Sequence, residues 1–598
     1  MVKIWAPLAK QVDLVLPEKR HGLSPGHGGW WSAEVGLAHG VDYQFCLNGE
    51  CYPDPRSPWQ PNGVHGPSRH YDHQKFAWQC DQWPVLPLRS AIIYELHVGT
   101  FSEQGTFAAA IEQLDYLVRL GITHVELMPV VEFLGQKGWG YDGVFPFAPH
   151  HRYGGPDGLK SFVDAAHLRG LNVLLDVVHN HLGPSGNYLP QFGPFFTSRY
   201  VTPWGPALNF DGPESDEVRE YFIASARMWL REYRLDGLRL DAVHAILDHS
   251  AVHFLEQLAT EISALSKEVG RELVLIAESD LNDPRLIRSA ENGGYGLQAQ
   301  WSDDFHHALH TVLTREQTGY YEDFGKLAHL AAAMASPFVY AGDYSPHRKR
   351  KHGRPPHGLP SDRFLAYLQN HDQIGNRAKG ERIAHLVGFD LAKVGAALVL
   401  LSPYVPLLFQ GEEWAASSPF QYFVEFAVEP DLAASVVKGR KSEFMAFGWN
   451  EEEIPNPNDP ATFARSQLRW NEIEQAPHRE MLDWYRSLIS FRRSERFQQS
   501  SLAAAKVNFC EENRWLVVER SGLSIAANFS AKAQRVPLAS ADEQRIVLAS
   551  KPSWSPSFSR PSSCAQGPPE ARTPTGTNTG LIELQPESVV VYAAYSPQ

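Results

Sequence analysis

Three acidic side chains follow apolar runs along the chain, and their types and spacing suit the cleavage of a glycosidic bond. Asp241, Glu278 and Asp372 each come after a stretch with the composition of a β-strand. A parallel barrel exposes the residues that follow its strands at one rim, where three carboxylates can meet. Glycoside hydrolysis needs two carboxyl groups, one of which donates a proton. The four polar-ended segments are DVVHNH (176–181), GLRLDAVH (237–244), LIAESD (275–280) and LQNHDQIG (368–375).

Each carboxylate has a candidate role and a structural alternative. Arg239 lies two residues before Asp241 on the same side of a strand, where a guanidinium keeps a nucleophile ionised; a structural Arg–Asp pair is the alternative. Glu278 ends the apolar run LVLIA, so desolvation would favour a general acid, while a solvated rim glutamate is the alternative. Asp372 could hold sugar hydroxyls or cap a helix.

The histidines and cysteines give little support for a metal site. In DVVHNH, the polar residues Asp176, Asn180 and His181 are either structural or metal-binding, and His179 with His181 resembles a metal motif only weakly. The five cysteines are odd in number and form no CxxC pair, which favours reduced thiols in a cytoplasmic protein. We therefore expect no metal and no cofactor.

Charge and hydropathy exclude two classes of partner. A formal net charge of −14 would repel phosphate backbones, so we expect no nucleic-acid partner. The longest apolar stretch, 394–409, is interrupted by Ser402-Pro403 and Pro406, so we expect no membrane span. The first ten residues contain no apolar signal core, in keeping with a cytoplasmic location.

The elements that would position the carboxylates alternate between strand-like and helix-like stretches. Eight such β-then-α units predict a closed (β/α)8 TIM barrel, with an open doubly wound sheet as the alternative. The predicted strands are AIIYELHV, ITHVELMPV, LNVLLDVVH, DGLRLDA, ELVLIAES, LQAQWSD, FLAYLQNHD and YVPLLFQGEE.

Apolar–polar alternation at both ends predicts two further β domains. We expect an N-terminal β-sandwich over 1–88, the catalytic barrel with rim insertions over 89–500, and a C-terminal β-sandwich over 501–598. Within the last, residues 551–578 are rich in Ser, Pro, Gly and Thr and are interpreted as a disordered or loosely packed loop.

The four polar-ended segments closely resemble the signature regions of the α-amylase superfamily. The resemblance implies that Asp241 is the nucleophile, Glu278 the general acid/base and Asp372 the transition-state stabiliser. It also implies that Arg239 positions Asp241, and that His181 and His371 hydrogen-bond the sugar at the cleaved bond.

Further segments, including KGWGYDGVFPFAPHHRYGGPDGLK, TPWGPALNFDG and FQGEEWAASSPFQYF, resemble the maltooligosyltrehalose trehalohydrolases within that superfamily. This implies a retaining hydrolase that cuts the α-1,4 bond next to a terminal trehalose and releases trehalose. Tyr141 would stack under the sugar, and Trp204 would form an aromatic wall, with a core tryptophan as the alternative. His244 and Glu413 are candidates for recognising the trehalose end. The implied partners are maltooligosyltrehalose and related α-glucans, with functional pairing to a maltooligosyltrehalose synthase.

Two features depart from the expected pattern or stay unassigned. Residues 424–432 read VEFAVEPDL where an acidic–histidine turn is expected, and the basic loop 345–358 could contact sugar through His352 and Arg354 or be a solvated loop. The enzymatic alternative is a glycogen branching or debranching enzyme, which shares the barrel and the three carboxylates. A catalytically inactive glucan-binding protein is disfavoured because all three carboxylates are present.

Overall fold

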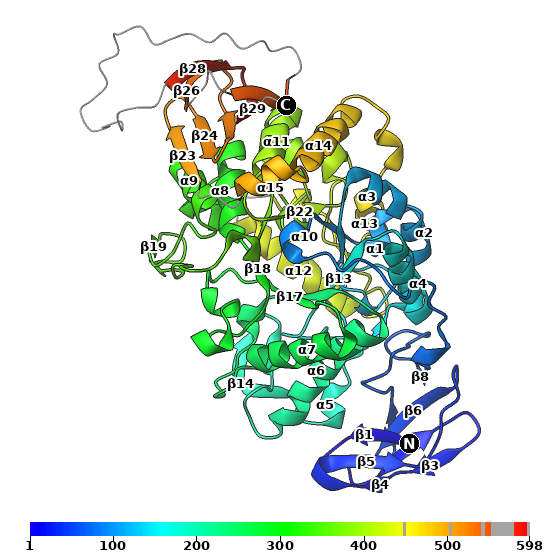
Figure 1. The fold of residues 1–598 in the computed structure, drawn as a ribbon. Coiled ribbons are helices and arrows are strands. Elements are labelled where there is room, and N and C mark those ends of the chain that lie inside the picture. Colours follow the sequence, from blue (N-terminus) through cyan, green and yellow to red (C-terminus); the bar gives the residue numbers. More distant parts are fainter. Residues whose placement is uncertain (447–449, 502–504, 540–543, 552–578, 595–598) are drawn as a thin grey trace. The chain divides into compact units, whose positions relative to one another are not determined.

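The computed structural model describes residues 1–446, 450–501, 505–539, 544–551 and 579–594 (Figure 1). Contacts divide the chain into two compact units. Unit 1 comprises Met1–Trp301, Gln373–Gly380 and Ser418–Leu468; unit 2 comprises Ser302–Asp372, Glu381–Ser417 and Arg469–Gln598. The expected division at 88 and 500 stays a prediction. Except for Lys551, the Ser/Pro-rich segment 551–578 lies outside the described residues.

Eight parallel strands form a closed barrel, which confirms the predicted fold class. Each strand lies within one of the eight apolar runs singled out in the sequence. In spatial order they are β10 (His124–Leu127), β13 (Asn172–Val177), β16 (Gly237–Leu240), β17 (Val274–Ala277), β18 (Ala299–Trp301), β21 (Phe364–Tyr367), β22 (Val405–Phe409) and β9 (Ile93–Leu96). Nearly every residue of these strands is buried, as expected for parallel strands covered by helices.

Helices and short antiparallel hairpins occupy the connections between the strands. In unit 1 the helices are α1 (Val98–Phe101), α2 (Phe107–Ile111), α3 (Leu114–Leu120), α4 (Gly155–Leu168), α5 (Leu189–Phe192), α6 (Ser215–Glu232), α7 (Phe254–Val269), α12 (Pro430–Ala446) and α13 (Pro460–Ser466). Unit 2 contains α8 (Asp303–Thr314), α9 (Leu327–Ala335), α11 (Ile383–Leu400), α14 (His478–Arg492) and α15 (Glu495–Ser501). The short α10 (His371–Gly375) follows β21. The hairpins are β11 (Val131–Glu132) with β12 (Phe145–Pro149), β14 (Phe196–Thr202) with β15 (Gly205–Leu208), and β19 (Tyr344–Ser345) with β20 (Arg350–Lys351).

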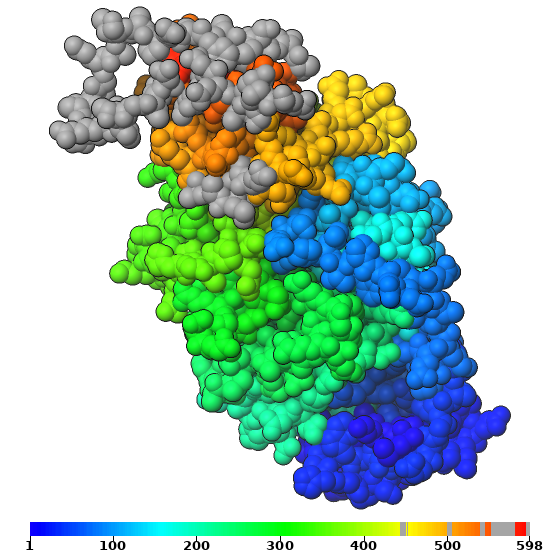
Figure 2. Space-filling view, in the orientation of Figure 1, coloured from blue at the N-terminus to red at the C-terminus, as the bar shows by residue number. Residues whose placement is uncertain are grey.

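The N-terminal strands form two antiparallel sheets, seen in Figure 2 as a contiguous blue lobe. One contains β1 (Val2–Trp5), β5 (Trp30–Ala33) and β4 (Ser24–Pro25); the other contains β3 (Arg20–Gly22), β2 (Val12–Val15), β6 (Asp42–Leu47), β7 (Glu50–Tyr52) and β8 (Ser68–Arg69). Two hydrogen bonds attach this region to α6. The Trp30 indole donates to Glu217 Oε1 at 2.8 Å, and the Tyr221 hydroxyl donates to the Pro55 carbonyl at 2.8 Å.

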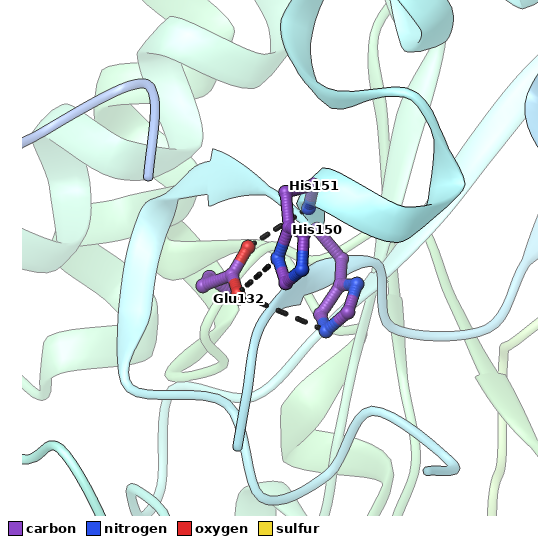
Figure 3. Close-up of side chains that lie close together, drawn as sticks. All are labelled: Glu132, His150 and His151. Atoms are coloured by element: carbon purple, nitrogen blue, oxygen red, sulfur yellow. Dashed lines mark hydrogen bonds and ion pairs between the residues drawn. The ribbon is translucent and has the colours of Figure 1, made fainter. Parts of the chain in front are cut away.

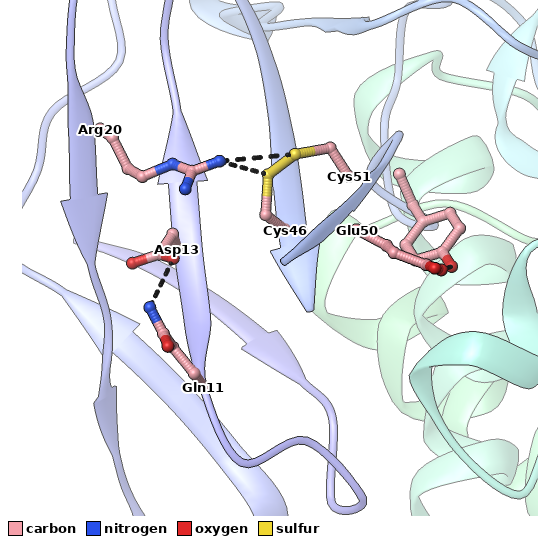
Figure 4. Close-up of a disulfide and its surroundings, with 7 residues drawn as sticks. Gln11, Asp13, Arg20, Cys46, Glu50 and Cys51 are labelled. Carbon is pink, nitrogen blue, oxygen red and sulfur yellow. Dashed lines mark hydrogen bonds between the residues drawn. A yellow bond between two sulfur atoms is a disulfide. The ribbon is translucent and has the colours of Figure 1, made fainter. Parts of the chain in front are cut away.

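A disulfide in this region corrects the expectation that all cysteines are reduced. Cys46 and Cys51 are bonded across the β6–β7 hairpin (Figure 4). The antiparallel register places the two residues directly opposite each other, with their Cα atoms 3.8 Å apart, whereas their sequence spacing showed no such pairing. Cys80 and Cys510 are free. The cytoplasmic location stays a prediction.

The C-terminal strands of unit 2 form two antiparallel sheets around a small apolar core. The first has the order β23 (Lys506–Cys510), β24 (Trp515–Arg520), β25 (Leu523–Asn528), β29 (Ser588–Ala594) and β27 (Gln544–Ala549); the second pairs β26 (Gln534–Ala539) with β28 (Thr579–Leu584). Buried residues from both sheets form one cluster, including Val517, Val536, Ile582 and Tyr592. This is the arrangement expected of a β-sandwich.

One helix of the described residues, α11, is long and apolar enough to cross a membrane by length and composition. Half of it is buried in the protein, and it packs against α8, α14 and β29 of the same unit. These contacts are those of a core helix in a large folded domain.

Candidate active site

Adjacent barrel strands in unit 1 place Asp241 and Glu278 side by side. The parallel register pairs Leu240 of β16 with Ala277 of β17, one step before the two carboxylates. The pairing continues past the strand ends, because the Glu278 amide donates to the Leu240 carbonyl at 3.1 Å. Residues at the same register position of parallel strands point to the same face. The sequence therefore delivers two carboxylates to one end of the barrel interior.

Arg239 connects three carboxylates at this position. Its Nη1 donates to Asp176 Oδ2 at 2.7 Å and to Asp241 Oδ1 at 3.0 Å, and its Nη2 lies 3.1 Å from Glu278 Oε2. The guanidinium is fully buried. Burial lowers the pKa of Arg239, but the charges of Asp176 and Glu278 raise it by more, so it lies well above the ordinary value. Arg239 is therefore a fixed cation between the nucleophile and acid candidates.

Asn180 joins Asp241 to His181. Its side-chain amide donates to both the backbone carbonyl and Oδ2 of Asp241, each at 2.7 Å. Its Oδ1 accepts the Nδ1–H of His181 at 2.5 Å. Burial lowers the pKa of His181, partly offset by the negative charge of Asp241. The two Asp241 oxygens are thus each held by a different donor, Arg239 on one side and Asn180 on the other.

The residue after the nucleophile candidate orients Glu278. The Ala242 amide donates to Glu278 Oε2 at 2.5 Å. Ala242 has φ 39°, in the left-handed region that non-glycine residues rarely adopt, and such strained positions cluster at functional sites. Because Oε2 faces this amide and the Arg239 cation, the proton of the acid form must reside on Oε1.

Tyr141 reaches the same cluster from the loop between β11 and β12. Its hydroxyl donates to Asp176 Oδ2 at 2.6 Å and lies 3.5 Å from Arg239 Nη1. The preceding Gly140 has φ +98°, and a Cβ there would lie 2.1 Å from the Pro129 carbonyl oxygen, so only glycine permits this approach. The ring of Tyr141 is half-buried, consistent with a surface that contacts a sugar.

Trp204 stacks on His181. It occupies the turn between β14 and β15, is 47% exposed, and its ring lies 4.2 Å from the imidazole at an interplanar angle of 3°. The exposed fraction rules out the core-tryptophan alternative. The other sequence candidate in this unit, His244, has its Nδ1 4.0 Å from Asp280 Oδ1, and both side chains are about one-third exposed.

The remaining candidates belong to unit 2. His371 is buried, and its Nε2 lies 3.4 Å from Oδ1 of the partly exposed Asp372. The backbone amide of Asp372 donates a hydrogen bond to Asn370 Oδ1 at 3.0 Å. Glu413 is fully buried in the short turn after β22, so its predicted contact with substrate is not supported by exposure. The roles of these three residues stay predictions.

Comparisons with known proteins identify relatives over most of the chain. The family described as alpha amylase, catalytic domain, matches residues 78–192, and a domain of unknown function (DUF3459) matches residues 501–591. A malto-oligosyltrehalose trehalohydrolase from Mycobacterium tuberculosis is 49% identical over 545 residues, which cover 90% of this chain and 93% of that protein. The chain belongs to the malto-oligosyltrehalose trehalohydrolase family.

A solved structure and a more distant relative complete the comparison. A crystal structure from Salmonella typhimurium, of a protein provisionally named an alpha amylase, is 37% identical with a TM-score of 0.87, covering 99% of this chain and 97% of that one. A 1,4-alpha-glucan branching enzyme from Vibrio parahaemolyticus is 32% identical over 351 residues, 51% of this chain and 46% of that enzyme. The trehalohydrolase similarity therefore extends over far more of the chain than the branching-enzyme similarity.

Among the described residues of this trehalohydrolase family member, one cluster could hold a metal ion: Glu132, His150 and His151 (Figure 3). Glu132 Oε1 lies 2.7 Å from His151 Nδ1 and 3.8 Å from His150 Nε2, and Glu132 Oε2 accepts the His151 amide at 2.9 Å. His150 Nδ1 accepts the Arg152 amide at 3.2 Å, so the neutral ring carries its proton on Nε2 and offers no lone pair there. The cluster is a hydrogen-bonded brace of the β11–β12 hairpin. The absence of a metal requirement stays a prediction.

Sequence reasoning left two residues of the site undecided. The sequence leaves Asp176 and Asn180 open between structural and metal-binding roles, whereas the structure gives them hydrogen bonds to Arg239, Tyr141 and Asp241. Their four-residue spacing places them on one side of an extended segment, which is the signal that could have found them.

The two unassigned sequence features also have definite positions. In the basic loop, His352 is buried and Arg354 is exposed, so only the latter can contact a solute. In the departing segment 424–432, Glu425 Oε2 accepts the Gln136 amide at 2.5 Å, which connects this segment to the loop that carries Tyr141.

Proposed function

We propose that this chain is a retaining glycoside hydrolase that cleaves the α-1,4 bond next to the terminal trehalose of maltooligosyltrehalose and releases trehalose. Membership of the trehalohydrolase family carries the substrate. The pairing of Asp241 and Glu278 around Arg239 carries the chemistry, because it supplies an oriented carboxylate beside a second carboxyl group. The expected location is the cytoplasm, with a synthase that makes the trehalosyl end as the functional partner.

The first step forms a glycosyl-enzyme ester. An oxygen of Asp241 attacks the anomeric carbon while the bond to the leaving sugar breaks, and the leaving oxygen takes the proton from Glu278 Oε1. Arg239 and Asn180 hold the Asp241 oxygens in fixed directions, so little reorganisation is needed. In the second step Glu278, now a carboxylate, removes a proton from water. The water oxygen then attacks the anomeric carbon and releases Asp241.

Aromatic and polar side chains around the pair would bind the sugar. Tyr141 and the His181–Trp204 stack present ring faces, which pack against the CH faces of a pyranose. Asp372 and His371 would hold sugar hydroxyls. His244 follows Asp241 in sequence, Asp280 follows Glu278, and both side chains are partly exposed, which makes them candidates for contacts with the leaving trehalose.

Product analysis tests the function. The enzyme is incubated with a trehalosyl maltooligosaccharide and with plain maltohexaose, and free trehalose and shortened oligosaccharides are separated. We expect kcat/KM to be far higher for the trehalosyl substrate, because groups that hydrogen-bond the α,α-1,1 end are left unpaired by another end. Equal kcat/KM values would reduce the proposal to a general α-glucan hydrolase. New α-1,6 branches would instead support the branching-enzyme alternative. The observation behind that alternative is the similarity to the branching enzyme from Vibrio parahaemolyticus, which covers 51% of this chain.

A further inference from the structure

Arg239 is fixed by hydrogen bonds at only one of its nitrogens. All of its hydrogen bonds within the described residues are made by Nη1, to Asp176, Asp241 and Tyr141. Its Nε and Nη2 make none there, and the 3.1 Å approach of Nη2 to Glu278 is an ion-pair contact without hydrogen-bond geometry. The bonds from Nη1 hold one end of the guanidinium, but among the described residues no hydrogen bond holds the edge formed by Nε and Nη2.

Trp301 supplies the missing restraint. It is the last residue of β18 and is 1% exposed. The Arg239 Cζ lies over its ring, 4.3 Å from the centroid. The register pairs Ala277 with Gln300, so the next step along both strands sets Trp301 beside Glu278. A buried indole face attracts a cation and accepts only guanidinium orientations that lie over it.

We propose that Trp301 is a positioning residue for the glycosidic reaction, which it serves by fixing the plane of Arg239 so that Nη2 stays against Glu278. The inference rests on the proposed roles of Asp241 and Glu278. Trp301 is too deeply buried to touch substrate, so it acts through Arg239. A purely structural tryptophan would support folding without affecting how Glu278 gains and loses its proton.

The test compares three variants of the full chain. Trp301→Leu removes the ring face, and Trp301→Phe keeps an aromatic face. The matched control is Trp229→Leu, because Trp229 is an equally buried tryptophan of the same unit that packs on Tyr233 and donates to the Pro146 carbonyl. The readouts are kcat, KM, the pH dependence of kcat/KM, and thermal unfolding. Rates are measured on whichever of the trehalosyl oligosaccharide and maltohexaose the wild type cleaves, so failure of the substrate assignment does not affect this test.

We expect Trp301→Leu to lower kcat about 30-fold with little change in KM, as the loss of a desolvated cation–π contact implies. The alkaline limb of its pH profile should move to higher pH, because a carboxyl group that loses a neighbouring cation holds its proton to higher pH. Trp301→Phe should retain most of kcat, with the alkaline limb displaced upward by less than in Trp301→Leu, because a phenyl face binds the cation more weakly than an indole face. Trp229→Leu should lower the unfolding temperature without moving the limb.

Three results would overturn the proposal. The first is a wild-type kcat and pH profile in Trp301→Leu, and the second is the same change in Trp301→Leu and Trp229→Leu. If Trp301→Leu does not fold, Trp301→Phe alone decides. A smaller loss of kcat with an upward displaced alkaline limb then supports the proposal, because a phenyl face binds a cation more weakly than an indole face. An unchanged profile in Trp301→Phe, together with reduced stability, would show a structural role only.

Discussion

Removing the Asn180 side chain should impair catalysis through Asp241. Asn180 is 2% exposed, and its amide donates at 2.7 Å to Oδ2 of Asp241. In Asn180→Ala the nucleophile keeps the Arg239 bond to Oδ1 but loses the donor that fixes its other oxygen. A hydrogen bond to a charged group contributes about 1.5–3 kcal/mol. If that contribution is realised in the transition state, kcat/KM falls about 10- to 150-fold.

Asn180→Asp tests the same contact by reversing its electrostatics. Asn180→Asp keeps the size of the side chain but places a carboxylate where the amide faces Asp241, so like-charge repulsion replaces attraction. We expect a loss of kcat/KM greater than in Asn180→Ala at neutral pH, with partial recovery at lower pH as the new carboxyl group is protonated. Initial rates of trehalose release across pH 4 to 9, an assay range chosen to span ordinary carboxyl titration, measure both variants.

The matched control is Asn172→Ala. Asn172 is also a buried asparagine, but it is the first residue of β13, where its side chain bonds the Leu86 amide and the Pro84 carbonyl. This variant should lose stability and keep kcat/KM per folded molecule. A kcat/KM for Asn180→Ala within twofold of the wild type, or an equal loss in Asn172→Ala, would refute the role assigned to Asn180.

Further predictions concern the carboxylates, pH and metal. Asp241→Asn should abolish turnover and leave thermal unfolding nearly unchanged, because an amide cannot form the glycosyl ester; residual activity near the wild-type level would contradict it. Glu278→Gln should lose far less activity on aryl glycosides than on oligosaccharides, since an activated leaving group needs no proton, and equal losses would count against the acid role. Burial raises the pKa of Glu412 from an unfolded value near 4.5 to about 8 in the folded protein. The folded state therefore holds this proton more tightly, so the free energy of unfolding is fully retained below the unfolded pKa and falls as the pH rises to about 8. Glu412→Gln should therefore reduce the slope of unfolding free energy against pH between these two pKa values. One proton contributes at most about 1.4 kcal/mol per pH unit to this slope, which denaturant titration measures. An unchanged slope would show that another group is responsible. Exhaustive dialysis against EDTA should leave activity intact, and a loss restored by a divalent ion would point to the cluster at Glu132.

The barrel and the positions of Asp241 and Glu278 could be predicted from the amino-acid pattern. All eight runs contain a barrel strand, because a parallel strand covered on both faces is built mostly from apolar residues. Asp241 and Glu278 could be placed from the same pattern, since a polar residue directly after such a run lies at the strand end. Resemblance to known signature regions then supplied the chemistry that composition alone left open.

The side chains that hold these residues in place could not be predicted before the fold was known. The contacts of Asn180 with Asp241, of Trp301 with Arg239 and of Cys46 with Cys51 depend on strand register and turn geometry. A shift of one residue in a strand turns every side chain to the opposite face, so these contacts follow from pairings between segments. The residues of one strand alone do not make one register lower in free energy than another. That difference arises only when the segments pack together and bury their apolar faces against each other.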